Sequence, residues 1–199
     1  MGMEAMKAGD FAEAYCLWRP LALRGHVEAA YHLGWLYANG NGLRVNAKKA
    51  VYWWRQAASK GHTDAMFALA LAYTQGDGIA KDSEQAMQWY LKAARQGHED
   101  AREIIKSEIR SGSQAIQPYL PALLKESWIG HVVEIKVAQA NLRSGPGVDQ
   151  PLTGRARQGE RFVAVQRKGK WFQVIKSDDL SYAWVAEWLT DQVRKKVNV

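Results

Sequence analysis

The hydrophobic and polar positions of residues 1–112 repeat with a step of 36 residues. The repeated columns hold glycine, histidine, alanine and aromatic residues: Gly25, Gly61 and Gly97, then His26, His62 and His98, then Ala29, Ala65 and Ala101, then Trp18, Trp54 and Tyr90. So many columns in phase do not arise from composition alone. A period of this length is typical of a solenoid of helix pairs.

Each unit of the repeat predicts two helices separated by a glycine-rich turn. In the copy that begins at Ala29, apolar residues follow at i+4, i+7 and i+8, which indicates the buried face of a first helix. Asparagine and glycine at 39–42 then end that helix, because both tolerate positive φ. Asn46 is the predicted N-cap of the second helix, and Asp10 and Asp82 occupy the same phase.

These units resemble the Sel1-like repeat, a relative of the tetratricopeptide repeat. The matching motif is Leu33-Gly34-x-x-Tyr37-x-x-Gly40-x-Gly42 followed by Asn46-x-x-x-Ala50-x-x-Trp54-x-x-x-Ala58-x-x-Gly61. The second copy has Ala70 where the family usually has glycine. The resemblance covers residues 1–112. It implies an all-α solenoid of helical hairpins that acts as an interaction scaffold without catalysis of its own.

The helical pattern stops in residues 113–130, which we predict to be a linker. Pro118 and Pro121 lie close together there, and Gly112 and Gly130 stand at its ends, a composition typical of a domain boundary. The leucines around Leu120 could form one short helix packed on the solenoid or on the module that follows.

From His131 the period of the pattern changes to two. Short alternating or apolar runs predict strands at 131–137, 162–165, 171–175, 182–186 and 188–190, with a hairpin turn at 167–170. Five short strands without a helical pattern favour a small all-β barrel or sandwich over residues 131–191. Residues 192–199 form a basic tail.

This second segment is similar to a bacterial SH3-like domain. The most specific stretch is Asn141-Leu142-Arg143-Ser144-Gly145-Pro146-Gly147, and Ala183-Trp184-Val185 follows with alanine where that family usually has glycine. The resemblance implies an SH3-like β-barrel of the kind found in bacterial envelope and cell-wall proteins, with peptide or peptidoglycan-type ligands.

Composition and charge narrow the class of protein. The 199 residues carry a formal net charge of +7, of which residues 1–112 contribute +2 and residues 113–199 contribute +5. We favour a solvated basic surface over an anionic partner as the reason for this charge.

No apolar run is long enough to span a bilayer, and the polar residues 1–10 lack the apolar stretch of a secretory leader. Cys16 is the single cysteine, so no intramolecular disulfide can form.

No set of residues predicts catalysis, a metal or a cofactor. Cys16 lies within the apolar pattern of a repeat helix, so we expect a buried structural thiol rather than a nucleophile. His26, His62 and His98 occupy one column, but adjacent helices lie about 8–10 Å apart, too far for shared ligation at about 2 Å. We expect them to be turn residues, as we do the adjacent Asp178 and Asp179.

Two groups of residues are candidate binding sites. Trp35 lies off the buried stripe of its helix and shares a face with His32 and Asn39, which suggests a groove for a protein partner on the concave face of the solenoid. Simple packing against the neighbouring unit is an equally weighted alternative. In the second module, an aromatic-lined ligand cleft would use Arg143, Trp171, Tyr182, Trp184 and Trp188. The alternative is that most of these rings fill the barrel.

The sequence therefore predicts a two-module, non-catalytic interaction protein of the bacterial envelope or periplasm, with the cytoplasm left open. The solenoid would bind a protein partner, and the SH3-like domain would bind a peptide or cell-wall ligand. An accessory subunit of a cell-wall or signalling enzyme is the first alternative. Nucleic-acid binding through the basic C-terminal half, including Arg194 to Lys196, ranks lower, and an enzyme ranks last.

Overall fold

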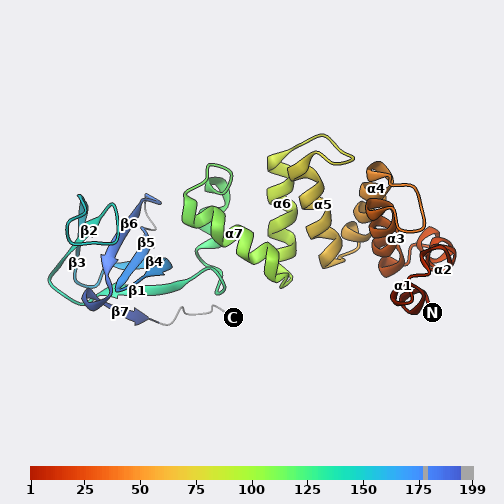
Figure 1. The fold of residues 1–199 in the computed structure, drawn as a ribbon. Helices are drawn as coiled ribbons and strands as arrows, with labels where there is room; N and C mark the ends of the chain where they lie inside the picture. The colour runs from red at the N-terminus through yellow and green to blue at the C-terminus, as the bar shows by residue number, and fades with distance from the viewer. Residues whose placement is uncertain (177–178, 194–199) are drawn as a thin grey trace. The chain divides into compact units, whose positions relative to one another are not determined.

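The computed structural model describes residues 1–176 and 179–193. The chain forms two compact units, Met1–Ile104 and Ile105–Val199. Helices make up the first unit, and an antiparallel sheet with short helical segments makes up most of the second (Figure 1). The predicted class, an all-α solenoid followed by a small all-β SH3-like barrel, is confirmed.

The helices follow the predicted repeat. They are α1 (Gly2–Lys7), α2 (Phe11–Leu23), α3 (Val27–Asn39), α4 (Ala47–Ser59), α5 (Thr63–Gln75), α6 (Ser83–Arg95) and α7 (Glu99–Ser111). Within the first unit, α1 packs with α2, α3 with α4 and α5 with α6, so that each pair forms one hairpin (Figure 1). Each hairpin also packs on the next through α2 and α3 or α4 and α5.

The predicted helix caps are present. The side-chain oxygens of Asp10, Asn46 and Asp82 accept hydrogen bonds from backbone N–H groups three residues later, at 2.9 Å, 3.0 Å and 2.9 Å. Gly40 and Gly76 end α3 and α5 in the left-handed conformation, with φ of +72° and +80°. These caps satisfy backbone groups that the helix termini would otherwise leave unpaired.

Glycines of the loops allow successive hairpins to touch. A Cβ atom on Gly78 would lie 2.3 Å from the carbonyl carbon of Ala47, at the start of α4. One repeat earlier, a Cβ atom on Gly42 would lie 2.8 Å from Cβ of Phe11, at the start of α2. Both glycines also have positive φ. This column therefore requires glycine for close approach as well as for backbone conformation.

The thiol of Cys16 is exposed, which corrects the prediction of a buried structural cysteine. The buried face of α2 consists of Ala14, Trp18 and Ala22, spaced by four residues. Cys16 stands two residues after Ala14, about 200° further round a helix with 3.6 residues per turn. Its position among apolar neighbours in the sequence therefore did not place it on the apolar face.

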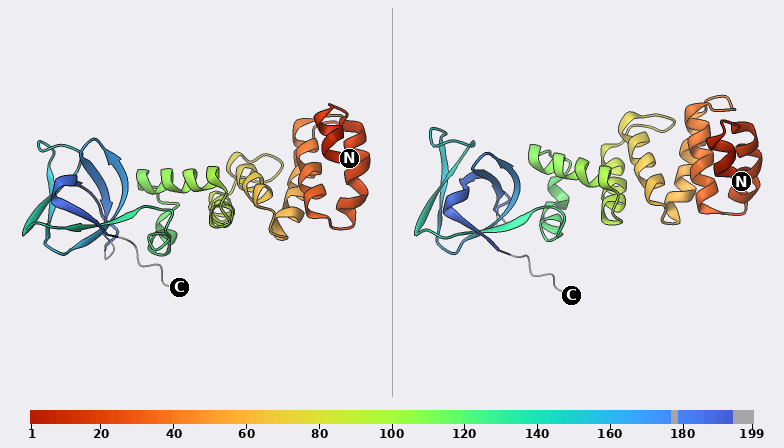
Figure 2. Two further views of the ribbon diagram at one scale, coloured as in Figure 1. Left: turned by 90° about the horizontal axis from the view of Figure 1, so that it is seen from below. Right: turned by 60° about the horizontal axis from the view of Figure 1, so that its bottom comes forward.

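The second unit contains a seven-stranded antiparallel sheet in the part of the chain that the structure describes. The strands are β1 (His131–Ile135), β2 (Gln139–Arg143), β3 (Leu152–Arg157), β4 (Arg161–Lys168), β5 (Trp171–Ile175), β6 (Tyr182–Ala186) and β7 (Thr190–Val193). Their order is β3-β2-β6-β5-β4-β1-β7, and the sheet curls around a core (Figure 2). Short helical segments η1 (Gln117–Tyr119) and α8 (Leu120–Leu123) precede the sheet, and η2 (Glu187–Leu189) interrupts its end.

Three details of the predicted sheet were wrong. Strands β2 and β3 were missed, because β3 is mostly exposed and the few inward residues of the pair include the small Ala140 and Ala156. Residues 188–190 were predicted as a strand, but Glu187–Leu189 form a 3-10 turn. The backbone N–H of Glu187 donates a hydrogen bond to the carbonyl of Lys170 at 2.9 Å, and this bond fixes the start of the turn.

The barrel core is formed by alternate residues of the strands. It contains Val133, Ile135, Ala140, Leu142, Ala156, Phe162, Ala164, Phe172, Val174, Ala183 and Val185. The division between the two compact units falls within α7, between residues 104 and 105. The domain limits at 1–112, 113–130 and 131–191 stay a prediction, and residues 194–199 of the basic tail lie outside the described part of the chain.

Candidate binding sites

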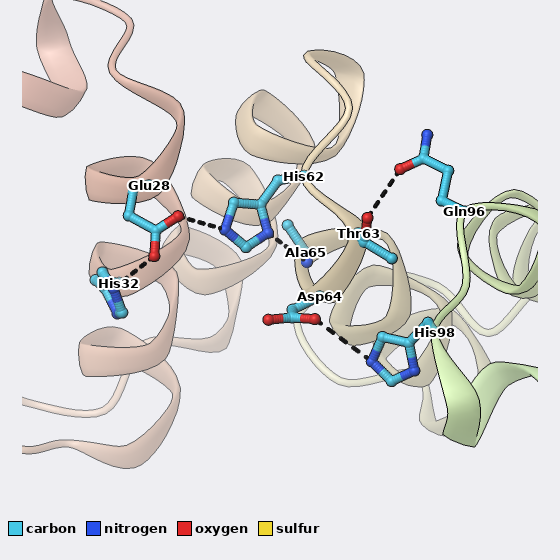
Figure 3. A network of polar contacts seen from close by, with 8 residues as sticks. All are labelled: Glu28, His32, His62, Thr63, Asp64, Ala65, Gln96 and His98. Atoms are coloured by element: carbon cyan, nitrogen blue, oxygen red, sulfur yellow. Dashed lines mark hydrogen bonds and ion pairs between the residues drawn. The ribbon is translucent and has the colours of Figure 1, made fainter.

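Two histidines of the repeated column, His62 and His98, contact the preceding hairpin of the first unit (Figure 3). Nδ1 of His62 accepts a hydrogen bond from the backbone N–H of Ala65 at 3.2 Å, so the side chain caps α5. Nε2 of His62 lies 3.0 Å from Oε2 of Glu28 in the preceding hairpin. The ring stacks on Tyr31 with centroids 4.4 Å apart. Because Nδ1 accepts, Nε2 carries the proton and donates a hydrogen bond to the carboxylate of Glu28.

The next copy repeats this arrangement. Nδ1 of His98 accepts from the N–H of Ala101 at 3.3 Å, and its Nε2 lies 3.7 Å from Oδ1 of Asp64. The ring of His98 stacks on Phe67 at 4.2 Å. Each of the two histidines thus contacts a carboxylate and an aromatic ring of the preceding hairpin. We refer to this set of contacts as the histidine clasp, and its role is to stack repeats.

The three residues proposed for the partner groove differ in exposure. His32 is only 6% exposed and stacks on Trp18 with centroids 4.2 Å apart. Burial lowers the pKa of His32 although Glu28, 3.2 Å from its Nε2, favours the charged form. Trp35 is half-buried with its ring 6.3 Å from that of Phe11, and Asn39 is exposed. His32 therefore lies in the packed interior, and a groove at Trp35 and Asn39 stays a prediction.

Four of the five ligand residues proposed for the second unit share one face of the sheet. Arg143 pairs with Trp184, and Trp184 pairs with Gln173 on the next strand. Trp171 stands two residues from Gln173, and Tyr182 stands two residues from Trp184. Because side chains alternate across a strand, all of them point away from the barrel core.

Trp188 joins this outer face through Trp171. The two rings meet edge to face with centroids 5.6 Å apart, and Trp188 is 49% exposed. Lys168 pairs with Trp171 across the β4–β5 hairpin, and Lys170 is exposed in the turn. We refer to Trp171 and Trp188 as the tryptophan pair; it is an aromatic surface bordered by positive charge.

The rest of the outer face is partly occupied by the unit itself. Nη1 of Arg143 donates to the carbonyl of Gln150 at 2.6 Å, which holds the loop after β2. The amide of Gln173 donates to the carbonyl of Arg110, at the end of α7, at 3.3 Å. Burial raises the pKa of Tyr182, whose ring lies next to Gly112. The structure thus divides the predicted cleft into an open tryptophan pair and a more covered remainder.

Asp179 lies in a turn, as the sequence predicted. Asp179 is exposed and its Oδ1 accepts from the N–H of Ser181 at 2.9 Å, whereas Asp178 lies outside the described residues, as do Arg194 to Lys196. Among residues 1–176 and 179–193, no group of three or more histidine, cysteine or acidic side chains is placed to hold a metal ion. Within the same residues, no helix has the length and apolar character to cross a membrane.

Comparisons with known proteins identify both modules. The family model of the Sel1 repeat matches residues 27–62 and 63–98, and the model of the bacterial SH3 domain matches residues 138–191. The chain is therefore a Sel1-repeat protein with a C-terminal bacterial SH3 domain. The crystal structure of a Sel1 repeat protein from Oxalobacter formigenes aligns with a TM-score of 0.54 and 32% identity, over 60% of this chain and 52% of that one.

Among curated proteins the similarity is local. A probable cell wall amidase LytH of Staphylococcus epidermidis is 38% identical over 52 residues, and the LytH of Staphylococcus saprophyticus is 35% identical over the same length. In both comparisons the match covers 26% of this chain and 18% of the amidase. The chain thus spans less than a fifth of the length of these relatives.

Proposed function

We propose that this protein is a non-catalytic scaffold whose repeats bind a protein partner and whose SH3-like domain binds peptide or peptidoglycan-type ligands through the tryptophan pair. The observation that carries the second half is the exposed face of Trp188 packed edge-on against Trp171. A large aromatic side chain that is about half exposed on the surface of a barrel is available to an external ligand.

The chemistry around the pair suits a cell-wall ligand. Aromatic rings stack on the apolar faces of sugars and extended peptides, and their burial supplies contact area at low cost in conformational entropy. Lys168 and Lys170 add positive charge beside the rings, which favours ligands that carry carboxylates, as peptidoglycan stem peptides do. The likeness to proteins named as probable cell wall amidases supports a place in the bacterial envelope.

Co-sedimentation with purified peptidoglycan tests this proposal. We expect the Trp171→Ala/Trp188→Ala double variant to lose at least about tenfold in affinity, since two aromatic contacts are removed together. Leu152→Ala is the matched control, because Leu152 is also a large exposed apolar residue of the same unit, at 53% exposure. It should bind peptidoglycan as the unchanged protein does.

Two results would contradict the proposal. One is equal sedimentation of the double variant and the Leu152→Ala control. The other is displacement of the unchanged protein from peptidoglycan by a single-stranded oligonucleotide whose affinity for the protein falls steeply as the salt concentration rises. That result would favour the nucleic-acid alternative.

A further inference from the structure

Two hollows open on the first unit, against the same three helices. One has a volume of about 590 Å³ and includes Tyr15, Tyr37, Arg44 and Lys49 in its lining. The other has a volume of about 130 Å³ and is bordered by the large apolar side chains of Leu23, Tyr52 and Trp53. Neither was expected from the sequence, because their lining residues come from α2, α3, α4 and the loop between α3 and α4.

Helical spacing places the two hollows on the same side of α2, α3 and α4, towards opposite ends of these helices. On α4, Lys49 lines the first hollow, Tyr52 and Gln56 line the second at i+3 and i+7, and the C-cap residue Lys60 follows at i+11. These positions form one stripe along a helix. On α2 the lining residues are Tyr15, Ala22 and Leu23, and on α3 they are Tyr37, Ala30 and Val27. Each set also lies along one side of its helix. We call the two hollows together the α2–α4 groove; residues of α3 also line both of them.

The first end of the groove is cationic. Nζ of Lys49 lies 5.0 Å from the centre of the Tyr37 ring, and the hydroxyl groups of Tyr37 and Tyr15 are 3.3 Å apart. Arg44 is exposed at the rim, and no acidic residue of the described chain lines either hollow. Among the residues that the structure describes, Arg44 and Lys49 form no ion pair. Two cations and two hydroxyl groups thus surround an open space without a described carboxylate to balance them.

The other end of the groove is apolar. Leu23 is 63% exposed and Tyr52 is 53% exposed, while Trp53 is half-buried beside them. Lys60 does not oppose this character, because its Nζ donates to the carbonyl of Gly25 at 2.8 Å. Eight helical residues separate Tyr15 from Leu23, or about 12 Å at 1.5 Å per residue. An extended peptide covers that distance in roughly four residues.

The equivalent positions one repeat later keep Tyr73 and Trp89 for Tyr37 and Trp53, but four other lining residues differ. Thirty-six positions later, Tyr15, Arg44, Lys49 and Tyr52 are replaced by Val51, Ala80, Gln85 and Gln88. The stacking of hairpins is the same at both junctions, so stacking does not require the charges or the exposed rings. The presence of Arg44, Lys49 and the exposed Tyr52 at the first junction but not at the second is expected of a site adapted to a ligand rather than of the repeat architecture.

We propose that the α2–α4 groove binds an extended segment of a partner protein that carries an Asp or Glu about four residues from a large apolar side chain. The carboxylate lies between Arg44, Lys49 and the hydroxyl groups of Tyr15 and Tyr37. The apolar side chain packs on Leu23, Tyr52 and Trp53. This inference rests on the proposed scaffold function of the repeats and specifies the chemistry of the partner.

An array of immobilised octapeptides tests the groove with the full-length chain. Each peptide has a Gly-Ser background with one Glu and one Leu or Phe, at separations of one to six residues, and a counterpart with Lys in place of Glu. We expect the strongest binding at separations of three to five, and at least about tenfold weaker binding of every Lys counterpart. Arg44→Glu/Lys49→Glu should abolish the preference for Glu, and Tyr52→Ala should weaken binding several-fold.

Gln85→Glu is the matched control, because Gln85 occupies the position of Lys49 in the next repeat. It should bind the array as the unchanged protein does. Circular dichroism checks that each variant is folded, which we expect because Arg44, Lys49 and Tyr52 are exposed. No dependence on the Glu–apolar separation, equal binding of Lys counterparts, or an equal effect of Gln85→Glu would overturn the proposal.

Two further measurements distinguish a peptide groove from a phosphate site, and the groove from the tryptophan pair. The first is binding of labelled single-stranded dT12. If no peptide of the array binds, and dT12 binds the unchanged protein but not the Arg44→Glu/Lys49→Glu variant, the groove is a phosphate site and the peptide proposal is wrong.

The second is peptidoglycan sedimentation of the same variant, measured in parallel. Unchanged sedimentation beside an array without preference for Glu overturns the groove alone and leaves the proposed function standing.

Discussion

At the scale of single residues, the two repeats use different pairs of side chains at the same contact. A Cβ atom on Gly34 would lie 2.4 Å from Cδ1 and 2.5 Å from Nε1 of Trp54, so the indole needs glycine opposite it. In the second copy, Ala70 and Tyr90 occupy the equivalent positions, and both are buried. The departure of Ala70 from the family pattern thus accompanies the replacement of tryptophan by the smaller tyrosine.

We therefore expect Gly34→Ala to destabilise the first unit by about 1–3 kcal/mol through overpacking, although alanine is the better helix former. Adding Trp54→Tyr should recover part of that loss. Urea unfolding of the two single variants and the double variant measures the coupling. Ala70→Gly is the control, and should cost only about 1 kcal/mol from helix propensity. Additive effects of Gly34→Ala and Trp54→Tyr would contradict this pairing.

His32 makes the stability of the repeats depend on pH. Burial lowers the pKa of its imidazole below the ordinary value of about 6.5. The unfolded chain therefore takes up the proton at higher pH than the folded protein does. This contribution to stability is complete above pH 6.5 and is lost as pH falls from about 6.5 towards the pKa of the folded state.

Thermal unfolding between pH 5 and pH 8 measures this effect. We expect the unfolding midpoint of His32→Phe to fall less than that of the unchanged protein as pH drops through 6, because phenylalanine keeps the stack on Trp18 without a titrating group. His26→Ala, at an exposed histidine, should follow the unchanged protein. Identical pH profiles of all three proteins would show that His32 does not titrate differently on folding.

At the scale of elements, successive hairpins are joined by polar clasps and by close backbone contacts, and the two contribute differently. The carboxylates of Glu28 and Asp64 in the histidine clasps are more than half exposed, at 59% and 58%. Even a fully charged pair of side chains in such an exposed position contributes at most about 1 kcal/mol, so each clasp contributes no more than that. The contact of Gly78 with the start of α4 involves backbone atoms, which cannot move aside as a side chain can.

Gly78→Ala should accordingly cost more than a change at a glycine without such a contact. Gly61→Ala is the matched control, because Gly61 also has positive φ, +94°, but a Cβ atom added to it would meet no atom of the described chain within 4 Å. Both variants share the conformational cost of about 1 kcal/mol. The excess loss for Gly78→Ala, measured by urea unfolding, reports the close approach, and equal losses would argue against it.

The elements also show what the sequence could and could not predict. The caps at Asp10, Asn46 and Asp82 were predictable because a side chain three residues before the N–H that it accepts is a local relation. Strand β3 was not, although its partner β2 directly precedes it in the chain, because only Ala156 among its residues is buried. Pattern reasoning detects a strand through its apolar side chains, and β3 has almost none pointing inward.

At the scale of the whole molecule, the candidate sites were only partly predictable. The excess of aromatic residues in the second module suggested a cleft with Trp171, Trp184 and Arg143, and these side chains share one face of the sheet. The covering of Tyr182 and Gln173 by the end of α7 could not be foreseen, since it joins residues 63 positions apart. The α2–α4 groove was missed for the same reason, because three helices and a loop of the first unit meet there.

Overlapping fragments test the independence of the two units. Fragments 1–112 and 99–199 both include all of α7, so each retains the buried isoleucines Ile105 and Ile109. We expect the first to keep helical circular dichroism and the second a β spectrum, each with a cooperative thermal transition, since each unit has its own core. Loss of cooperative unfolding in either fragment would show that its core needs the other unit.

The histidine clasp has a consequence for how such a chain can change length. Glu28 offers the same acceptor to His62 that Asp64 offers to His98, with an aromatic ring beside each. A tandem duplication of one 36-residue segment would place a complementary donor and acceptor at the newly created junction. Gene duplication could thus extend the array without inventing a single new contact, and shortening by one whole segment would obey the same rule.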